Sequence, residues 1–315
     1  MANIHKDLKP SEDRGHLLTE QANPLSINLD QLETPSLVNL FIEEDLRPQQ
    51  AVAGAAPALS EAVDAIAERL RCGGRLYYLG AGTSGRLGVL DAAECPPTFC
   101  SDPEMVQGVL AGGSEALLRS SEGLEDQEMA GRADLDARSF CAKDCLVGIA
   151  AGGTTPYVRG GLAYAKAIGA LAIAMACVPT EQAPLPCDID IRLLTGPELL
   201  TGSTRLKAGT ATKMALNILS TAVMVRLGKV YGNRMVDVAA SNSKLVDRSL
   251  RILRDLAGVD RERGLRLLDQ TDGSVKLALL MAATDLDRHE AEQRLVDHNQ
   301  QLRSALTALG RSLQI

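Results

Sequence analysis

The apolar positions of this chain alternate between short continuous runs and longer stretches with helical spacing. Runs of about five apolar residues bounded by glycine or polar residues are typical of buried strands. They lie at residues 75–79, 146–151 and 171–176, and residues 105–110 and 189–194 are further strand candidates. The segments between them carry apolar residues three or four positions apart, the spacing of one helix face. This order of strand, turn and helix predicts an α/β fold with a doubly wound parallel sheet.

Proline sets the expected end of the first helix in this sheet region. The helix that follows the turn at 80–86 has to stop by Cys95, because Pro96 and Pro97 disfavour helical geometry before them and lack a backbone N–H. Glycine and apolar spacing place the other helices. We expect these at about residues 36–44, 59–70, 114–121, 157–168 and from 201–204 to about 228.

The pattern divides the chain into three parts. Residues 1–50 lack a sheet pattern and predict an irregular N-terminal arm with a short helix. Residues 51–243 contain all the strand signals. Residues 244–315 are charged, have helical spacing and contain no strand signal, so they predict a small helical module. Three helices are expected there, and Leu295, Leu302 and Leu306 mark the third.

Composition places the chain among cytoplasmic globular proteins. It has 315 residues, of which 45% are hydrophobic and 23% charged, and its start is too polar for a signal peptide. Its most apolar stretch, 208–227, contains Lys213 and Arg226, so we expect a buried helix and no membrane span. A net charge of −7 and only 3% aromatic residues argue against nucleic acid as a partner.

Cysteine and histidine limit the available chemistry. The seven cysteines form no CxxC motif, and Cys141 with Cys145 has no second pair to complete a metal site. We therefore expect reduced thiols and no metal. None of the four histidines lies between residues 17 and 288, where the strand signals are. A central site must then rely on carboxylates for acid and base catalysis.

Three hydroxyl-bearing turns follow the predicted strands. They lie at 80–86, 152–155 and 201–204. Glycine lets the backbone approach a phosphate, and a helix start supplies N–H donors and positive charge. The simpler alternative for the first turn is an ordinary helix cap by Thr83 or Ser84. Because the carboxyl ends of parallel strands share one edge, three such turns predict a common anion site.

The turns, in this order, resemble a sugar isomerase (SIS) domain. Longer segments narrow the resemblance to the N-acetylmuramic acid 6-phosphate etherases. They are LGAGTSGRLG at 79–88, DAAECPPT at 91–98, EGLED at 122–126, TGSTRLKAGT at 201–210 and GNRMVDV at 232–238, with LTEQ at 18–21 in the arm. The regulatory protein of glucokinase is a look-alike without catalytic activity. The second turn departs from the family pattern, because Gly152 and Thr154 replace a serine-glycine-arginine arrangement.

The resemblance implies a reaction and its residues. The etherase removes D-lactate from N-acetylmuramic acid 6-phosphate and adds water, with no cofactor or metal, as a homodimer in cell-wall recycling. Glu94 is then the acid that protonates lactate and later activates water, and Glu125 is the base at C2. Glu122 and Asp126 lie in the same acidic segment, and by sequence alone either could replace Glu125 as the base. The substrate-binding residues are Gly82, Thr83, Ser84, Gly85, Gly153, Thr154, Thr155, Glu198 and Ser203.

The distance along the chain between the first turn and Glu94 affects whether one sugar phosphate can contact both. A helix from Ser84 to Glu94 spans about 15 Å, which is long for one sugar phosphate. Either the helix starts late or bends, or Glu94 serves a site shared at a dimer interface, which we predict. Lys207 and Lys213 are expected to pair with the arm or the interface, with phosphate contact as the alternative. A phosphosugar isomerase and a non-catalytic sugar-phosphate sensor are the rival functions.

Overall fold

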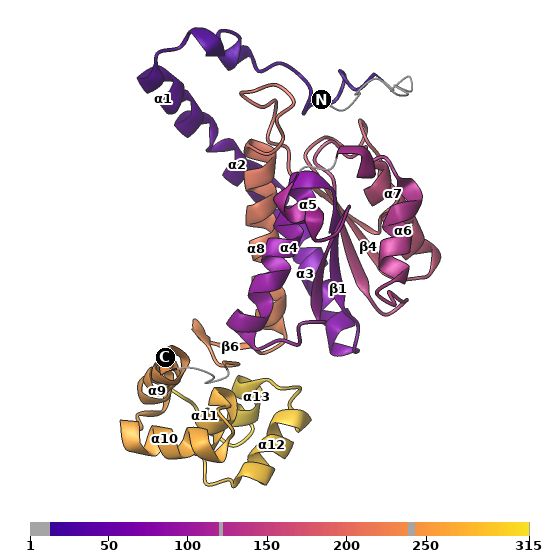
Figure 1. Cartoon of the computed structure of the whole chain (residues 1–315). Coiled ribbons are helices and arrows are strands. Elements are labelled where there is room, and N and C mark those ends of the chain that lie inside the picture. Colours follow the sequence, from indigo (N-terminus) through magenta and orange to yellow (C-terminus); the bar gives the residue numbers. More distant parts are fainter. Residues whose placement is uncertain (1–12, 120–121, 239–242, 315) are drawn as a thin grey trace.

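The computed structural model describes residues 13–119, 122–238 and 243–314. Its centre is a five-stranded parallel sheet in the order β2-β1-β3-β4-β5, which confirms the predicted doubly wound α/β fold (Figure 1). The strands are β1 (Leu76–Gly80), β2 (Val106–Leu110), β3 (Cys145–Ile149), β4 (Leu171–Ala176) and β5 (Ile189–Arg192). A small antiparallel hairpin joins β6 (Val230–Tyr231) to β7 (Arg234–Met235).

Helices cover both faces of the sheet and form the arm and the C-terminal module. They are α1 (Thr34–Glu44), α2 (Arg47–Gly54), α3 (Ala56–Arg71), α4 (Gly82–Phe99), α5 (Glu115–Leu118), α6 (Glu128–Asp136), α7 (Pro156–Ala167), α8 (Lys207–Arg226), α9 (Ser243–Ala257), α10 (Arg261–Gln270), α11 (Val275–Ala283), α12 (Arg288–Asp297) and α13 (Leu302–Thr307). Short 3-10 turns lie at Pro24–Ser26, Leu29–Gln31 and Glu122–Leu124. The helices predicted at 36–44, 59–70, 157–168 and up to about 228 are therefore present as α1, α3, α7 and α8.

The two faces of the sheet bury different sets of side chains. Successive residues of a strand point to opposite faces. Accordingly Tyr78 and Val147 join a core with α3, α4 and α8, whereas Tyr77 and Leu146 join a second core with α6 and α7. The three central strands β1, β3 and β4 are therefore buried on both sides, which is why their sequences are continuous apolar runs. The edge strand β5 instead alternates buried and half-buried positions.

Helix α4 runs further than the sequence predicted. It continues from Gly82 to Phe99 through Pro96 and Pro97, so the expected stop by Cys95 is wrong. Cys95 and Phe99 lie one turn apart and are both buried in the core shared with α3 and α8. Their packing holds the last turn in place although two backbone N–H donors are missing.

The C-terminal module has its own core, built by α9 to α13. The third expected helix is in fact two, because the chain breaks between α12 and α13, where Asn299 and Gln300 adopt positive φ values of 51° and 60°. Helix α10 was also not expected. The module's core already includes Tyr231 and Val236 from the hairpin region. The division at 243/244 stays a prediction.

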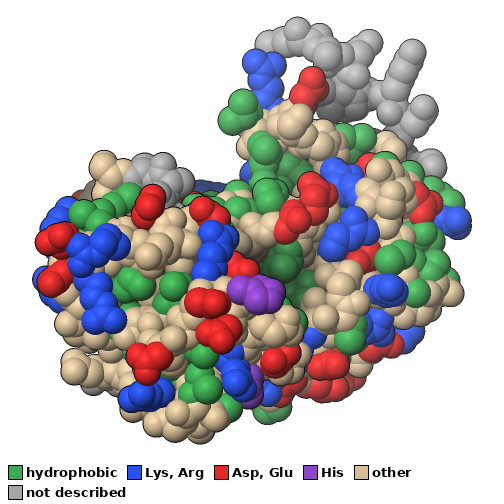
Figure 2. All heavy atoms as spheres, turned by 90° about the horizontal axis from the view of Figure 1, so that it is seen from below, with side chains coloured by type: hydrophobic (Ala, Val, Ile, Leu, Met, Phe, Trp, Pro, Cys, Tyr) green, Lys and Arg blue, Asp and Glu red, His purple; other side chains and the backbone are tan. Residues whose placement is uncertain are grey.

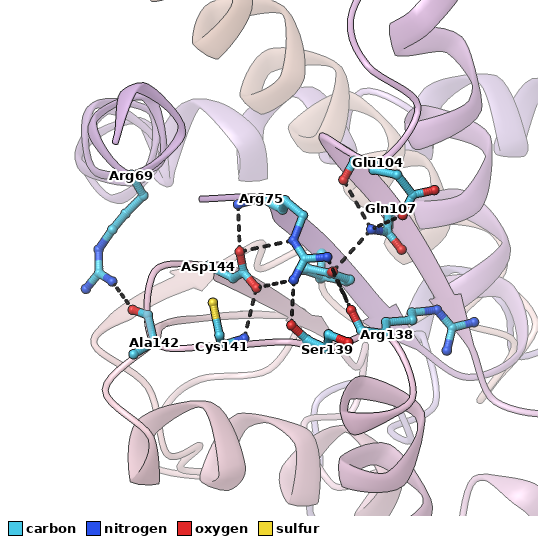
Figure 3. A network of polar contacts seen from close by, with 10 residues as sticks. Arg69, Arg75, Glu104, Gln107, Arg138, Ser139, Cys141, Ala142 and Asp144 are labelled. Carbon is cyan, nitrogen blue, oxygen red and sulfur yellow. Dashed lines mark hydrogen bonds and ion pairs between the residues drawn. The ribbon is translucent and has the colours of Figure 1, made fainter. Parts of the chain in front are cut away.

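A polar network anchors the amino end of the sheet. The buried carboxylate of Asp144 accepts hydrogen bonds from the Arg75 backbone N–H at 2.8 Å and its guanidinium Nη2 at 2.9 Å (Figure 3). The Cys141 backbone N–H donates to the same carboxylate at 2.9 Å. Cys141 is exposed and Cys145 is buried. These contacts fix β1 against β3 at the edge opposite the three turns.

Charged side chains of both signs are interspersed on the face seen in Figure 2. Within the part of the chain that the structure describes, no helix combines the length and apolar character that crossing a membrane requires. Helix α1 leads away from the sheet layers and shares little surface with them (Figure 1).

Candidate active site

The first turn leaves the start of α4 open. The residue before the helix is Ala81, which has no side-chain cap, so Thr83 and Ser84 are not cap residues and the alternative of an ordinary cap does not hold. A Cβ atom on Gly85 would lie 2.4 Å from the Gly80 carbonyl oxygen, so only glycine permits this approach of strand and helix. The first N–H groups of a helix have no partner within it. They are therefore available to an anion.

The second turn offers a similar arrangement. Gly153 has a φ of +69°, and a Cβ atom there would lie 2.7 Å from the Ala183 Cβ. Thr155 precedes α7 without making a side-chain cap, and Pro156 occupies the first turn of the helix. Thr154 and Thr155 are both half-buried. Their hydroxyl groups lie beside a second helix start.

Glu125 lies next to the second turn. Its backbone carbonyl accepts a hydrogen bond from the Tyr157 N–H, in the first turn of α7, at 3.0 Å. Its side chain is exposed. The structure thus brings the predicted base to the same helix start as Thr155.

The third turn differs from the other two because a carboxylate fills the helix start. The two oxygens of Glu198 accept hydrogen bonds from the Lys207 N–H at 3.0 Å and the Ala208 N–H at 2.9 Å. Glu198 is 1% exposed, and burial raises its pKa although these N–H groups act in the opposite direction. Ser203 remains in the turn before α8 and is half-buried. Glu198 as a sugar contact stays a prediction.

Close contacts bring the three turns together. A Cβ atom on Gly209 would lie 3.7 Å from the Thr83 Cγ2 and 3.4 Å from the Thr204 carbonyl oxygen, which joins the first turn to the third. One on Gly152 would lie 3.6 Å from the Thr19 Oγ1, and one on Gly202 3.2 Å from a Glu20 carboxylate oxygen. The expected convergence is present.

The N-terminal arm completes this convergence, which sequence reasoning missed. Adjacent residues Thr19 and Glu20 lie beside the second and third turns, and Leu17 is buried against Val178 and Ala183. The Leu18 N–H donates to the Gln182 side chain at 2.9 Å. The only signal in the sequence was the resemblance of residues 18–21 to the family. That resemblance did not predict where the arm lies relative to the turns.

Glu94 lies in a groove between α4 and α8. A 180 Å³ pocket is lined by Glu94, Asp91 and Lys213 with neighbouring leucines. A 280 Å³ pocket towards the first turn is lined by Thr83 and also by Lys213. Residues 83, 87, 91 and 94 share one face of α4 by helical spacing. The groove therefore runs from the phosphate turn to Glu94.

The helix between Thr83 and Glu94 is continuous. Because α4 begins at Gly82, a late start does not shorten the separation of about 15 Å between Ser84 and Glu94. The structure brings Glu125 to a hydroxyl turn but leaves Glu94 at the far end of the groove.

Asp91 is a buried carboxylate one turn before Glu94, and sequence reasoning did not single it out. Its Oδ1 accepts a hydrogen bond from the Ser220 hydroxyl at 3.0 Å, and the residue is 9% exposed. Burial raises its pKa. The hydroxyl of Tyr78, fully buried below it, also has a raised pKa, first from burial and then from the Asp91 charge. Asp91 thus links Glu94's helix to the core.

Comparison with known proteins identifies the relatives of this chain. It is 78% identical over 313 residues to the N-acetylmuramic acid 6-phosphate etherase of Synechococcus sp. strain CC9605, with 99% of each chain covered. The chain belongs to the N-acetylmuramic acid 6-phosphate etherase family. Another etherase of this family, from Synechococcus sp. strain CC9902, is 77% identical over 313 residues, again with 99% of each chain covered.

Two further comparisons concern parts of the chain. Residues 58–166 match the glucokinase regulatory protein N-terminal SIS domain. A phosphoheptose isomerase from Neisseria gonorrhoeae has a similar structure, with a TM-score of 0.46 and 18% identity, covering 61% of this chain and 98% of its own. The resemblance inferred from the sequence is confirmed. Among the residues that the structure describes, no three potential metal ligands of the His, Cys, Asp or Glu type cluster together.

Proposed function

We propose that this chain cleaves the D-lactyl ether of N-acetylmuramic acid 6-phosphate and adds water, giving N-acetylglucosamine 6-phosphate and D-lactate. The observation that carries the proposal is identity of 78% to a named etherase over 99% of both chains. The converged hydroxyl turns supply a site for the phosphate, and Glu94 and Glu125 supply the acid and the base.

The carboxylates suffice for both halves of the reaction. Ring opening exposes an aldehyde at C1, which acidifies the proton on C2. Glu125 removes that proton, the C2–C3 double bond forms, and the C3–oxygen bond breaks as Glu94 gives its proton to the departing lactate. Glu94 then accepts a proton from water as it adds to C3, and C2 is reprotonated from Glu125. Each carboxylate ends in its starting state, so no other acid or base is needed.

Lactate release in heavy water tests the reaction directly. The purified chain is incubated with N-acetylmuramic acid 6-phosphate in D₂O, and D-lactate and deuterium at C2 of the product are measured. We expect stoichiometric lactate and one deuterium at C2, since the exposed Glu125 carboxyl exchanges its proton with solvent before it reprotonates that carbon. Binding without either product would indicate a sugar-phosphate sensor, and deuterium at C2 without lactate release would indicate isomerase-type proton transfer.

We also propose that the protein is a homodimer that acts in the cytoplasm in cell-wall recycling. Helix α1 buries only Glu44 within its own chain, and Val38, Ile42 and the following Leu46 are 50%, 62% and 65% exposed. A 560 Å³ groove between α2, α3 and α8 is lined mainly by apolar side chains, including Val52, Leu59, Val63, Met214 and Ile218. A second copy of the chain supplies both an apolar helix and an apolar groove, so two copies can cover each other's surfaces.

Solution mass tests the dimer. We expect light scattering to give twice the 33.4 kDa chain mass for the wild type and a single chain mass for Ile42→Asp, because a buried charge at the interface is unfavourable. Met129→Asp on α6 is the matched control, since Met129 is 71% exposed on the opposite face of the sheet. A monomeric wild type, or a dimeric Ile42→Asp variant, would argue against this interface.

Mixed subunits test whether the dimer shares its sites. Glu94→Ala subunits are mixed with subunits that carry both Thr83→Ala and Ser84→Ala. Each of the two variants is expected to be inactive by itself. A shared site predicts recovery of part of the activity in the mixture, because one of the two sites then has all its residues. Failure to recover activity after subunit exchange has been verified would place Glu94 in its own chain's site.

A further inference from the structure

We propose that Lys213 binds the carboxylate of the lactyl group and so makes the site selective for the ether over sugar phosphates that lack lactate. The inference rests on the proposed function, because it concerns the same substrate. It assigns a specificity residue for the end of the groove where Glu94 lies.

Lys213 occupies the middle of the groove between α4 and α8. It lines both the 180 Å³ pocket with Glu94 and the 280 Å³ pocket with Thr83. Of the lysines and arginines in the described part of the chain, Lys213 alone lines the pocket around Glu94. At the other end, Arg205 lines the pocket beside Thr83. The groove thus has one cation near the phosphate turn and another near the acid.

The Lys213 charge acts on the nearby Asp91, where it opposes the rise in the pKa of that carboxyl caused by burial. Among the residues that the structure describes, the Lys213 ammonium group has no ion-pair or hydrogen-bond partner, and its side chain is exposed to the groove. Lys207 on the same helix contrasts with it, because that ammonium group lies 2.5 Å from the Glu44 carboxylate and is buried. The expected pairing therefore applies to Lys207, whereas Lys213 keeps its charge available for a ligand.

The chemistry of the leaving group requires a cation at this place. The lactyl carboxylate is bonded to the same carbon as the ether oxygen, so a side chain that protonates that oxygen has the carboxylate close by. Once Glu94 has given up its proton, the lactyl carboxylate would otherwise face only the acidic side chains of Asp91 and Glu94 in this pocket. An ammonium group in the same pocket offsets that repulsion and stabilises the departing lactate anion.

The size and lining of the pocket suit the lactyl group. Whole ligands occupy pockets of roughly 300–1,000 Å³, so 180 Å³ accommodates only part of the substrate. Leu87, Leu90 and Leu216 form its apolar wall. They offer contact to the methyl group of lactate, while Lys213 takes the carboxylate and Asn217 supplies a polar edge.

Substrate analogues combined with Lys213→Met test the assignment. The two compounds are N-acetylmuramic acid 6-phosphate and its lactyl amide, which has the same shape without the charge. We expect the wild type to prefer the acid by about 10- to 100-fold in kcat/KM, the value of one charge-assisted hydrogen bond. The Lys213→Met variant should lose that preference, and Lys166→Met, a lysine paired with Asp188 on the far face, should keep it.

Binding of the product separates the lactyl assignment from phosphate contact. Dissociation constants for the acid, the amide and N-acetylglucosamine 6-phosphate are measured by calorimetry in the Glu94→Gln background, where turnover does not interfere. We expect Lys213→Met to weaken binding of the acid only. Equal weakening for the product would assign Lys213 to the phosphate and overturn the inference, as would an unchanged preference for the acid. Failure of the proposed function would appear differently, as a wild type that binds the acid but releases no lactate.

Discussion

Replacing Glu94 with glutamine lowers the rate of D-lactate release by about 10²- to 10⁴-fold, the usual contribution of a positioned acid or base. The amide keeps the volume of the side chain in the groove but neither gives a proton to the lactyl oxygen nor accepts one from water. Exchange of the C2 proton with D₂O should continue, because Glu125 lies at the second turn. Lactate is measured enzymatically and exchange by mass spectrometry.

The matched variants assign the two roles. Glu125→Gln should abolish both exchange and lactate release, since elimination cannot begin with the C2 proton in place. Asp126→Asn, in the same acidic segment, should keep wild-type rates. If Glu94→Gln abolished exchange and Glu125→Gln kept it, the roles would be reversed. Loss of activity in Asp126→Asn alone would move the base to that residue.

Removing the Glu44 carboxylate should destabilise the fold by about 3 to 5 kcal/mol, the range for leaving one partner of a buried ion pair alone. The side chains of Lys207 and Glu44 are 3% and 8% exposed. Glu44 also accepts a hydrogen bond from Asn23 in the arm at 3.2 Å. Urea unfolding measures the loss in Glu44→Ala, and Glu43→Ala on the exposed side of α1 should change little.

The stabilisation by the ion pair of Glu44 and Lys207 should depend on pH in a defined direction. Burial acts to raise the pKa of Glu44, but Lys207 and Asn23 hold it below its ordinary value. A depressed pKa means that the contribution to stability is complete above the pKa of the unfolded chain, about 4.3, and is lost as pH falls through the folded value. The difference between wild type and Glu44→Gln should therefore narrow below about pH 4. A double variant with Lys207→Met should recover part of the loss, and additive losses would show that the pair is not coupled.

Local signals predicted most of the sheet. The run at 171–176 corresponds to β4 residue for residue, because a strand buried on both faces is apolar throughout. Proline was misleading at Pro96, because the packing of Phe99 against the core depends on residues distant in sequence. The break between α12 and α13 carries no glycine or proline, and only Asn299 hinted at a left-handed residue there.

The parts of the site that a local sequence motif defines could be predicted from the sequence. Glycine and hydroxyl residues after a strand predicted the turns around Thr83 and Thr155. The position of Glu20 beside the third turn was not predictable, because the path of an arm depends on tertiary packing. Asp91 was missed for a similar reason: its burial against Ser220 joins two helices far apart in sequence.

The carboxylate of Glu198 at the start of α8 has a consequence for the direction in which a sugar phosphate enters. Two of the three helix starts retain their partial positive charge, and the third is already neutralised by a side chain of this chain. A dianion is therefore drawn to the side of the first and second turns, while the third favours uncharged hydroxyl groups. We expect this difference in charge to orient the sugar phosphate, with its phosphate group towards the first and second turns, before it contacts a catalytic residue.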